Sequence, residues 1–188
     1  MFSELFNIIL KSIKLDKTFF SNNKNFGEAS IYYAILIILL GSIISIIPNS
    51  SFLNYMSDNF NLGQIRGPSL KVIIISSFIM WIIKTIYLYF VGVVLFQNKK
   101  TNCNFRKLLV LVAFAQSPLL LNFLVFNQSL LFFILLSYAW YNISLIIGLN
   151  IVLNYNNYLK TTLISLAPQI IFLLYFLSLV QGGSGIVS

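Results

Sequence analysis

Long apolar runs alternate with short polar segments along this chain of 188 residues. The five apolar runs cover residues 30–48, 70–96, 108–126, 129–153 and 161–181. Each run is close to or above the roughly 20 apolar residues that a helix needs to cross a bilayer core. The pattern therefore predicts an all-α fold, a polytopic transmembrane helical bundle of five spans within residues 30–181. It leaves no room for a second folded domain.

The segment before the first run, residues 1–29, has the spacing of an amphipathic helix over residues 2–20. Apolar and polar side chains separate onto two faces at the helical period. The apolar face holds Phe2, Leu5, Phe6, Ile9 and Ile13, and the polar face holds Glu4, Asn7, Lys11 and Lys14. We expect this helix either to lie in the interface of the cytoplasmic leaflet or to pack against the cytoplasmic end of the bundle. The pattern favours neither.

The basic residues predict the orientation of the spans. If all five runs cross, nine basic residues share the side of the N-terminus and two share the opposite side. The nine are Lys11, Lys14, Lys17, Lys24, Lys99, Lys100, Arg106, Lys107 and Lys160, and the two are Arg66 and Lys71. Because Lys and Arg collect in cytoplasmic loops, we expect a cytoplasmic N-terminus and an external (periplasmic or luminal) tail at residues 182–188.

The distribution of charge also predicts partners. Formal net charge is +8, but the basic residues are divided among short segments that a membrane would separate, so no nucleic-acid groove can form. Anionic lipid headgroups on the cytoplasmic side are the expected partners of juxtamembrane basic residues. The candidate contacts are Lys11, Lys14, Lys17, Lys99, Lys100, Arg106 and Lys107. Other membrane proteins and a second copy of the chain are further candidate partners.

The residue types exclude several kinds of chemistry. Hydrophobic residues make up 59% of the chain and charged residues 9%, which is too little polar surface for a water-soluble domain. With no His and a single Cys, Cys103, the chain can form neither an internal disulfide nor a Cys/His zinc site. We expect no cofactor, no metal and no enzymatic activity.

Lys84 lies near the middle of the second run, where a charge costs about 2.5–3.5 kcal/mol on insertion scales. No run contains Asp or Glu, but amides at similar expected depth occur at Gln116, Asn142 and Gln169. These four residues are a candidate midplane polar site in which Lys84 accepts an anion or moves a proton. Alternatively, the Lys84 amine is satisfied by amides and carbonyls inside the bundle, or reaches the interface by local thinning.

Two prolines lie inside apolar runs, Pro118 in the third and Pro168 in the fifth. Proline removes a backbone hydrogen bond from a helix, so we expect a kink at each position.

Two functions of different class fit the apolar runs, the basic residues and the position of Lys84. One is a membrane scaffold that binds lipids and other membrane proteins. The other is a small oligomeric carrier or channel that uses the polar layer around Lys84.

Several stretches together resemble the Yip family, the Ypt/Rab-interacting integral membrane proteins and their bacterial relatives. The resemblance rests on Lys17–Phe20, on Phe26–Ala29 before the first run, on Asn104–Leu109, on Ala113–Leu120 and on Trp140. It implies five spans, a cytoplasmic N-terminus and an outer C-terminus. In eukaryotic members it implies a role in vesicle traffic and in GTPase recruitment to membranes.

This chain departs from those eukaryotic members at its N-terminus. They carry a long cytoplasmic region with an Asp-Leu-Tyr-Gly-Pro signature, whereas residues 1–29 are short and lack that signature. Rab binding is therefore not carried over. The compact form is similar to the bacterial branch of the family.

Overall fold

The structure is a computed structural model that describes residues 2–27, 29–46, 67–96, 101, 103–124 and 132–183, and this part of the chain contains helices and no strand. In order, the helices are α1 (Phe2–Ile13), α2 (Lys17–Ser21), η1 (Asn23–Phe26), α3 (Ala29–Ile44), α5 (Leu70–Leu88), η2 (Tyr89–Leu95), α6 (Phe105–Ala115), η3 (Ser117–Leu124), α7 (Phe132–Val152) and α8 (Tyr158–Gly183). The all-α prediction is confirmed.

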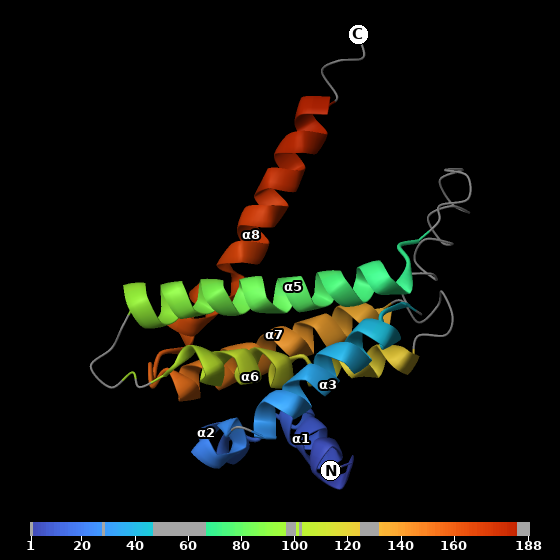
Figure 1. Ribbon diagram of the computed structural model, residues 1–188. Coiled ribbons are helices and arrows are strands. Elements are labelled where there is room, and N and C mark those ends of the chain that lie inside the picture. The colour runs from blue at the N-terminus through green and yellow to red at the C-terminus, as the bar shows by residue number, and fades with distance from the viewer. Residues whose placement is uncertain are drawn as a thin grey trace.

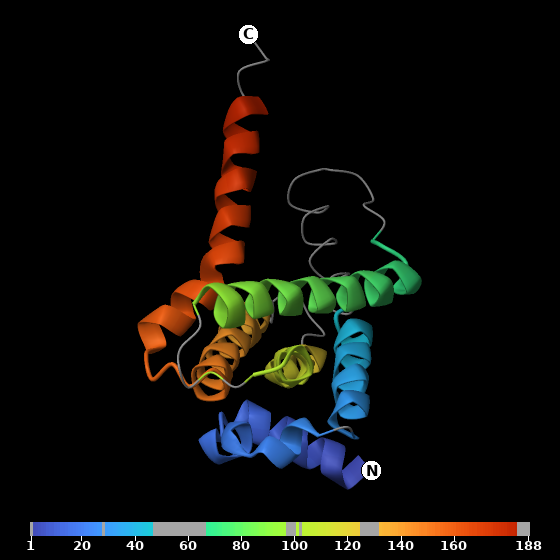
Figure 2. The same ribbon diagram turned by 60° about the vertical axis from the view of Figure 1, so that its left-hand side comes forward.

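The helices pack in layers (Figures 1 and 2). α5 lies on one side of α6 and α7, and α1 and α2 cover the opposite side. α3 runs beside these layers and contacts both α5 and α6. α8 packs against α7 and then changes direction, so that its distal part extends away from the other helices. Pro168 lies inside α8.

Three helices are long and apolar enough to cross a membrane among the residues that the structure describes. They are Leu70–Leu95, Phe105–Leu124 and Phe132–Val152, while Ser30–Ile44 is a shorter apolar helix. α8 coincides with the fifth predicted run, but its side chains beyond residue 171 are not described. The chain is therefore a membrane protein with several apolar helices, and crossing by all five runs stays a prediction.

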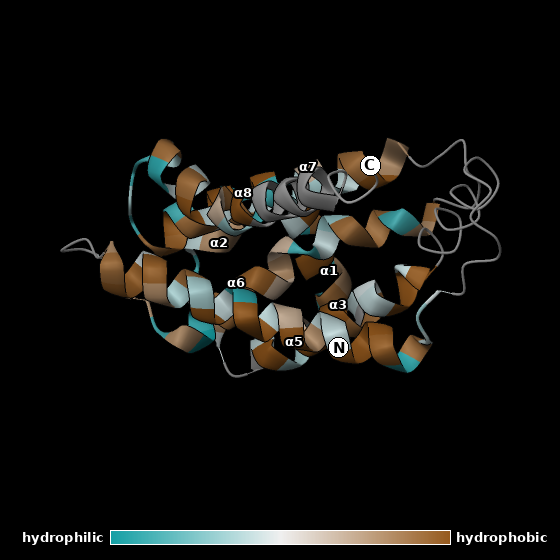
Figure 3. Cartoon of the chain, turned by 90° about the horizontal axis from the view of Figure 1, so that it is seen from above, coloured by the Kyte–Doolittle hydropathy of each residue, from teal (hydrophilic) through white to brown (hydrophobic). Residues whose placement is uncertain are grey.

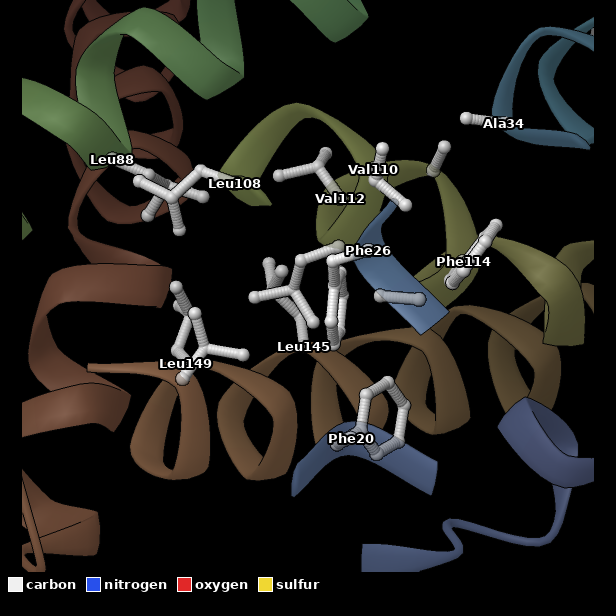
Figure 4. Close-up of a cluster of buried hydrophobic side chains, with 14 of the residues drawn as sticks. Phe20, Phe26, Ala34, Leu88, Leu108, Val110, Val112, Phe114, Leu145 and Leu149 are labelled. Carbon is white, nitrogen blue, oxygen red and sulfur yellow. The ribbon is translucent and has the colours of Figure 1, made fainter. Parts of the chain in front are cut away.

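α6 is the centre of the bundle. Leu108 and every residue from Val110 to Ala115 are fully buried, because α6 contacts α1, α3, α5 and α7. A helix that is apolar all round must be enclosed on all sides to bury its surface. Figure 4 shows how its side chains meet Phe20, Phe26, Leu145 and Leu149 from other elements.

α5 has one buried and one exposed face, and both are apolar. Trp81, Thr85 and Leu88 point into the bundle, whereas Ile79 and Ile83 lie on the exposed face with half or more of their surface accessible. Figure 3 shows hydrophobic colour along most of this helix. Water would not solvate such a face well, so lipid is its expected solvent.

Candidate functional site

Lys84 reaches from α5 to α7 and meets an aromatic residue. Its amine donates a hydrogen bond to the Tyr141 hydroxyl and lies 4.4 Å from the centre of the Tyr141 ring. Lys84 is half-buried and Tyr141 is buried. A cation near an aromatic face is attracted by the ring quadrupole, most strongly where water is excluded. The pair therefore joins α5 to α7 through one polar contact.

The three predicted amides take up other positions. The Gln169 amide nitrogen donates to the Asn142 side-chain oxygen at 2.9 Å, which joins α8 to α7. The Asn142 amide nitrogen in turn donates to the Tyr138 carbonyl. Gln116 ends α6, at the point where the α-helix gives way to the 3-10 helix η3. The Lys84 amine is bonded to Tyr141, a partner that the depth of each residue along its run did not predict.

Pro118 leaves one carbonyl of α6 without its helical donor. In a regular helix the amide of residue 118 would bond the carbonyl of Phe114, but proline has no N–H. The Ser12 hydroxyl, from α1, donates to this Phe114 carbonyl at 2.7 Å, and both groups are buried. Proline is tolerated inside membrane helices when another side chain satisfies the carbonyl that it leaves. α1 supplies that side chain here.

Aromatic residues attach the rest of the N-terminal segment to the bundle (Figure 4). Phe19 and Phe26 lie 5.7 Å and 6.3 Å from Phe114 between ring centres. Phe20 packs over Gly148 of α7, where an added Cβ would come within 2.5 Å of Leu111 and 3.4 Å of Phe20. The glycine therefore permits the close approach of α6, α7 and α2. Residues 17–26 act as a hydrophobic anchor.

The helical repeat divides the side chains of α1 into three sectors around the helix axis. One sector packs on the bundle through Leu5, Ile8, Ile9 and Ser12. Next to it, Phe6 and Leu10 are exposed, Phe6 by 62%. Asn7, Lys11 and Lys14 form the third, exposed polar sector. The Trp140 indole N–H of α7 donates to the Ile13 carbonyl at 2.7 Å, so α1 is joined to α7 as well as to α6.

The other candidate headgroup contacts have different surroundings. Lys17 is exposed at the start of α2. Arg106 and Lys107 are half-buried at the start of α6, and the Lys107 amine lies 5.6 Å from the centre of the Phe26 ring. Lys99 and Lys100 lie outside the described residues.

Sequence reasoning missed a cluster where α5 ends. α5 continues into η2, a π-helix, and the Tyr155 hydroxyl donates to the Gly92 carbonyl within it. The Lys160 amine donates to the Phe96 carbonyl at 2.9 Å and lies 4.1 Å from the Tyr155 ring centre. These contacts fix the α7–α8 turn against the end of α5. In the sequence, the irregularity at this point was Gly92, which lies within a stretch of aromatic and β-branched residues. π-helical turns occur mostly as local bulges inside α-helices, so this glycine was the one sign of where such a bulge lies.

Cys103, before α6, is a buried thiol. Burial raises the pKa of Cys103 to about 11, and nearby Lys107 lowers it in part. A raised pKa keeps the group a thiol at neutral pH, which suppresses its reactivity. Within the described part of the chain, no group of His, Cys, Asp or Glu is able to hold a metal ion.

Comparison with known proteins identifies the family. A family model described as the Yip1 domain matches residues 14–180, which is most of the chain. No curated protein and no solved structure matched. The matched region begins just after α1 and includes the hydrophobic anchor, the Lys84–Tyr141 pair and most of α8. The chain belongs to the Yip1 domain family.

Proposed function

We propose that this protein is an integral membrane scaffold, without catalytic activity or cofactor, that organises lipids and other membrane proteins. In this proposal all five runs cross the bilayer, the N-terminus is cytoplasmic and the C-terminus is external. The nine-to-two distribution of basic residues supports this orientation. Membership of the Yip1 domain family supports a membrane role.

The observation that carries the proposal is the exposed surface of α1. Phe6 and Leu10 face outward although the bundle already buries the neighbouring sector of the same helix. Lys11 and Lys14 follow directly around the helix. Helices that lie in a membrane interface combine an apolar sector with Lys on the adjoining polar face. We therefore assign Phe6 and Leu10 to the acyl boundary and the two lysines to anionic headgroups.

A depth measurement tests this assignment. In a Cys103→Ser background, single cysteines at positions 6, 7 and 10 carry an environment-sensitive dye, and the protein is reconstituted in vesicles with spin-labelled lipids. We expect quenching and blue-shifted emission at 6 and 10, and weak quenching at 7, which serves as the control on the same helix. Equal quenching at positions 6 and 7 would contradict the proposal.

The headgroup part of the proposal has its own test. Vesicles of phosphatidylcholine alone are compared with vesicles that also contain phosphatidylserine. We expect phosphatidylserine to increase hydrogen-exchange protection of residues 2–13, because each basic residue near an anionic surface contributes about 1 kcal/mol. Lys11→Gln with Lys14→Gln should remove most of that increase, while Lys71→Gln, on α5, should leave it intact. An increase that survives the double substitution would refute the assignment of these lysines.

A further inference from the structure

Lys84 and Tyr141 form a cluster of hydrogen-bond donors. An ammonium carries three N–H groups and a phenol carries one O–H. Only one of these four donors is used between them, in the bond from the Lys84 amine to the Tyr141 hydroxyl. Among the residues that the structure describes, the remaining donors of Lys84 and Tyr141 form no further hydrogen bond. Tyr141 is 4% exposed, so its hydroxyl has little access to water.

The amide next to Tyr141 in the sequence, Asn142, is already paired through both of its side-chain polar atoms. The Asn142 side-chain oxygen accepts from Gln169, and the Asn142 nitrogen is bonded to the Tyr138 carbonyl. The Tyr138 ring lies 5.8 Å from the Tyr141 ring between ring centres. The remaining donors of Lys84 and Tyr141 are therefore not used by the Asn142 amide.

Among the residues that the structure describes, no carboxylate balances the charge at Lys84. The chain has four acidic residues, Glu4, Asp16, Glu28 and Asp58, and all lie outside the five apolar runs. Glu4 accepts from the Tyr33 hydroxyl, and Asp16 caps the start of α2. Glu28 and Asp58 lie outside the described residues. A buried ammonium is stabilised by an opposite charge or by several acceptors.

We propose that Lys84 and Tyr141 bind a small monovalent inorganic anion of the halide class between α5 and α7. The Lys84 ammonium supplies the charge and the Tyr141 hydroxyl supplies a second donor. One positive charge suits a monovalent anion, because a divalent anion would leave a net charge in apolar surroundings. Lys84 lies on the flank of α5, between buried Trp81 and exposed Ile83, and its side chain is half-buried. The anion would stabilise the contact between the two helices, a role separate from the scaffold function.

Thermal unfolding in detergent tests the site. Chloride is titrated against gluconate at constant ionic strength. We expect a saturable rise of Tm in the wild-type protein and none in Lys84→Met, which keeps the unbranched stem. Tyr141→Phe should weaken the apparent affinity about tenfold, the usual consequence of losing a hydrogen bond to a charged group. Lys71→Met, an exposed lysine of the same helix, is the matched control and should respond like wild type. An equal response in Lys84→Met and wild type would overturn the proposal.

Iodide quenching gives a second measurement that needs no substitution at the site. The chain has two Trp residues, so Trp140→Phe leaves Trp81, which lies one turn from Lys84 on α5 and is buried. We expect saturable quenching of Trp81 by iodide and competition by chloride. Quenching that rises linearly with iodide, and that chloride does not reduce, would show only collisional access and would overturn the proposal even if Lys84→Met fails to fold.

Discussion

At the scale of single residues, side-chain donors bind backbone carbonyls of neighbouring helices. The Trp81 indole donates to the Leu109 carbonyl at 2.9 Å, and Trp140 and Tyr155 bind the carbonyls of Ile13 and Gly92. Interhelical hydrogen bonds of this kind, with small residues at close contacts, hold membrane helices together where lipid removes the usual hydrophobic drive. Each such contact depends on a few atoms, so single substitutions should have local and separable effects.

Gly148→Ala should lower stability. The added Cβ would lie 2.5 Å from the Leu111 side chain, which is fully buried and has little room to move. Overpacking of this kind costs about 1–3 kcal/mol, offset in part by about 1 kcal/mol of helix propensity. Thermal unfolding in detergent measures the result.

Gly41→Ala is the matched control for that substitution. Among the described residues, a Cβ at Gly41 meets only one atom, Leu120 Cδ2 at 3.9 Å, which is an ordinary contact. We expect this variant to be neutral or slightly stabilised, because alanine is the better helix former. Adding Leu111→Val to Gly148→Ala should recover part of the loss. Equal Tm values for the two glycine variants would show that the close approach at Gly148 is not as tight as described.

At the scale of elements, the N-terminal segment supplies a hydrogen bond that α6 and η3 lack. Pro118 removes the donor of the Phe114 carbonyl, and Ser12 of α1 replaces it. The sequence predicted one amphipathic helix over residues 2–20, where the structure has α1 and α2, and it predicted a kink at Pro118. It could not predict that the two meet. Nor could it separate Ile9, which packs on the bundle, from Phe6, which is exposed, since both are apolar.

Ser12→Ala should loosen α1. The substitution removes the buried hydrogen bond that the Ser12 hydroxyl donates to the Phe114 carbonyl, which contributes about 0.5–1.5 kcal/mol. We expect a lower Tm and faster hydrogen exchange in residues 2–13. Ser77→Ala is the control, because Ser77 donates to the Ile73 carbonyl within its own helix, where the backbone amide can already satisfy that carbonyl. Similar losses in both variants would mean that Ser12 has no special role in attaching α1.

At the scale of the whole molecule, the depth of a residue along its helix was easier to predict than the direction in which its side chain points. Counting residues gives depth along a span, at about 1.5 Å per residue. It drew attention to Lys84, but the rotation of α5 about its axis decides that Tyr141 is its partner. The pairing of Asn142 with Gln169 depends on the same kind of information. Apolar runs carry little rotational signal when both faces of a helix are hydrophobic, as in α5.

The five-span topology predicts which positions a membrane-impermeant thiol reagent can reach. In a Cys103→Ser background, we expect a cysteine at position 185 to react from the external side and one at position 17 from the cytoplasmic side. The native Cys103 should react slowly at pH 7–8, because its pKa is raised to about 11 and the thiolate is scarce. Reaction of position 185 from the cytoplasmic side alone would defeat the five-span topology.

The attachment of α1 to the flank of α6 has a consequence for the thickness of the bilayer. Phe114, which Ser12 contacts, lies nine residues after the first residue of α6, a depth of roughly 14 Å along the helix. If Lys11 and Lys14 keep their headgroup contacts, phosphates beside α1 must descend toward that level. The cytoplasmic leaflet would then be thinner on this side of the protein than elsewhere. Because mismatch costs fractions of a kcal/mol per ångström, the protein should prefer thin membranes over thick, sterol-rich ones.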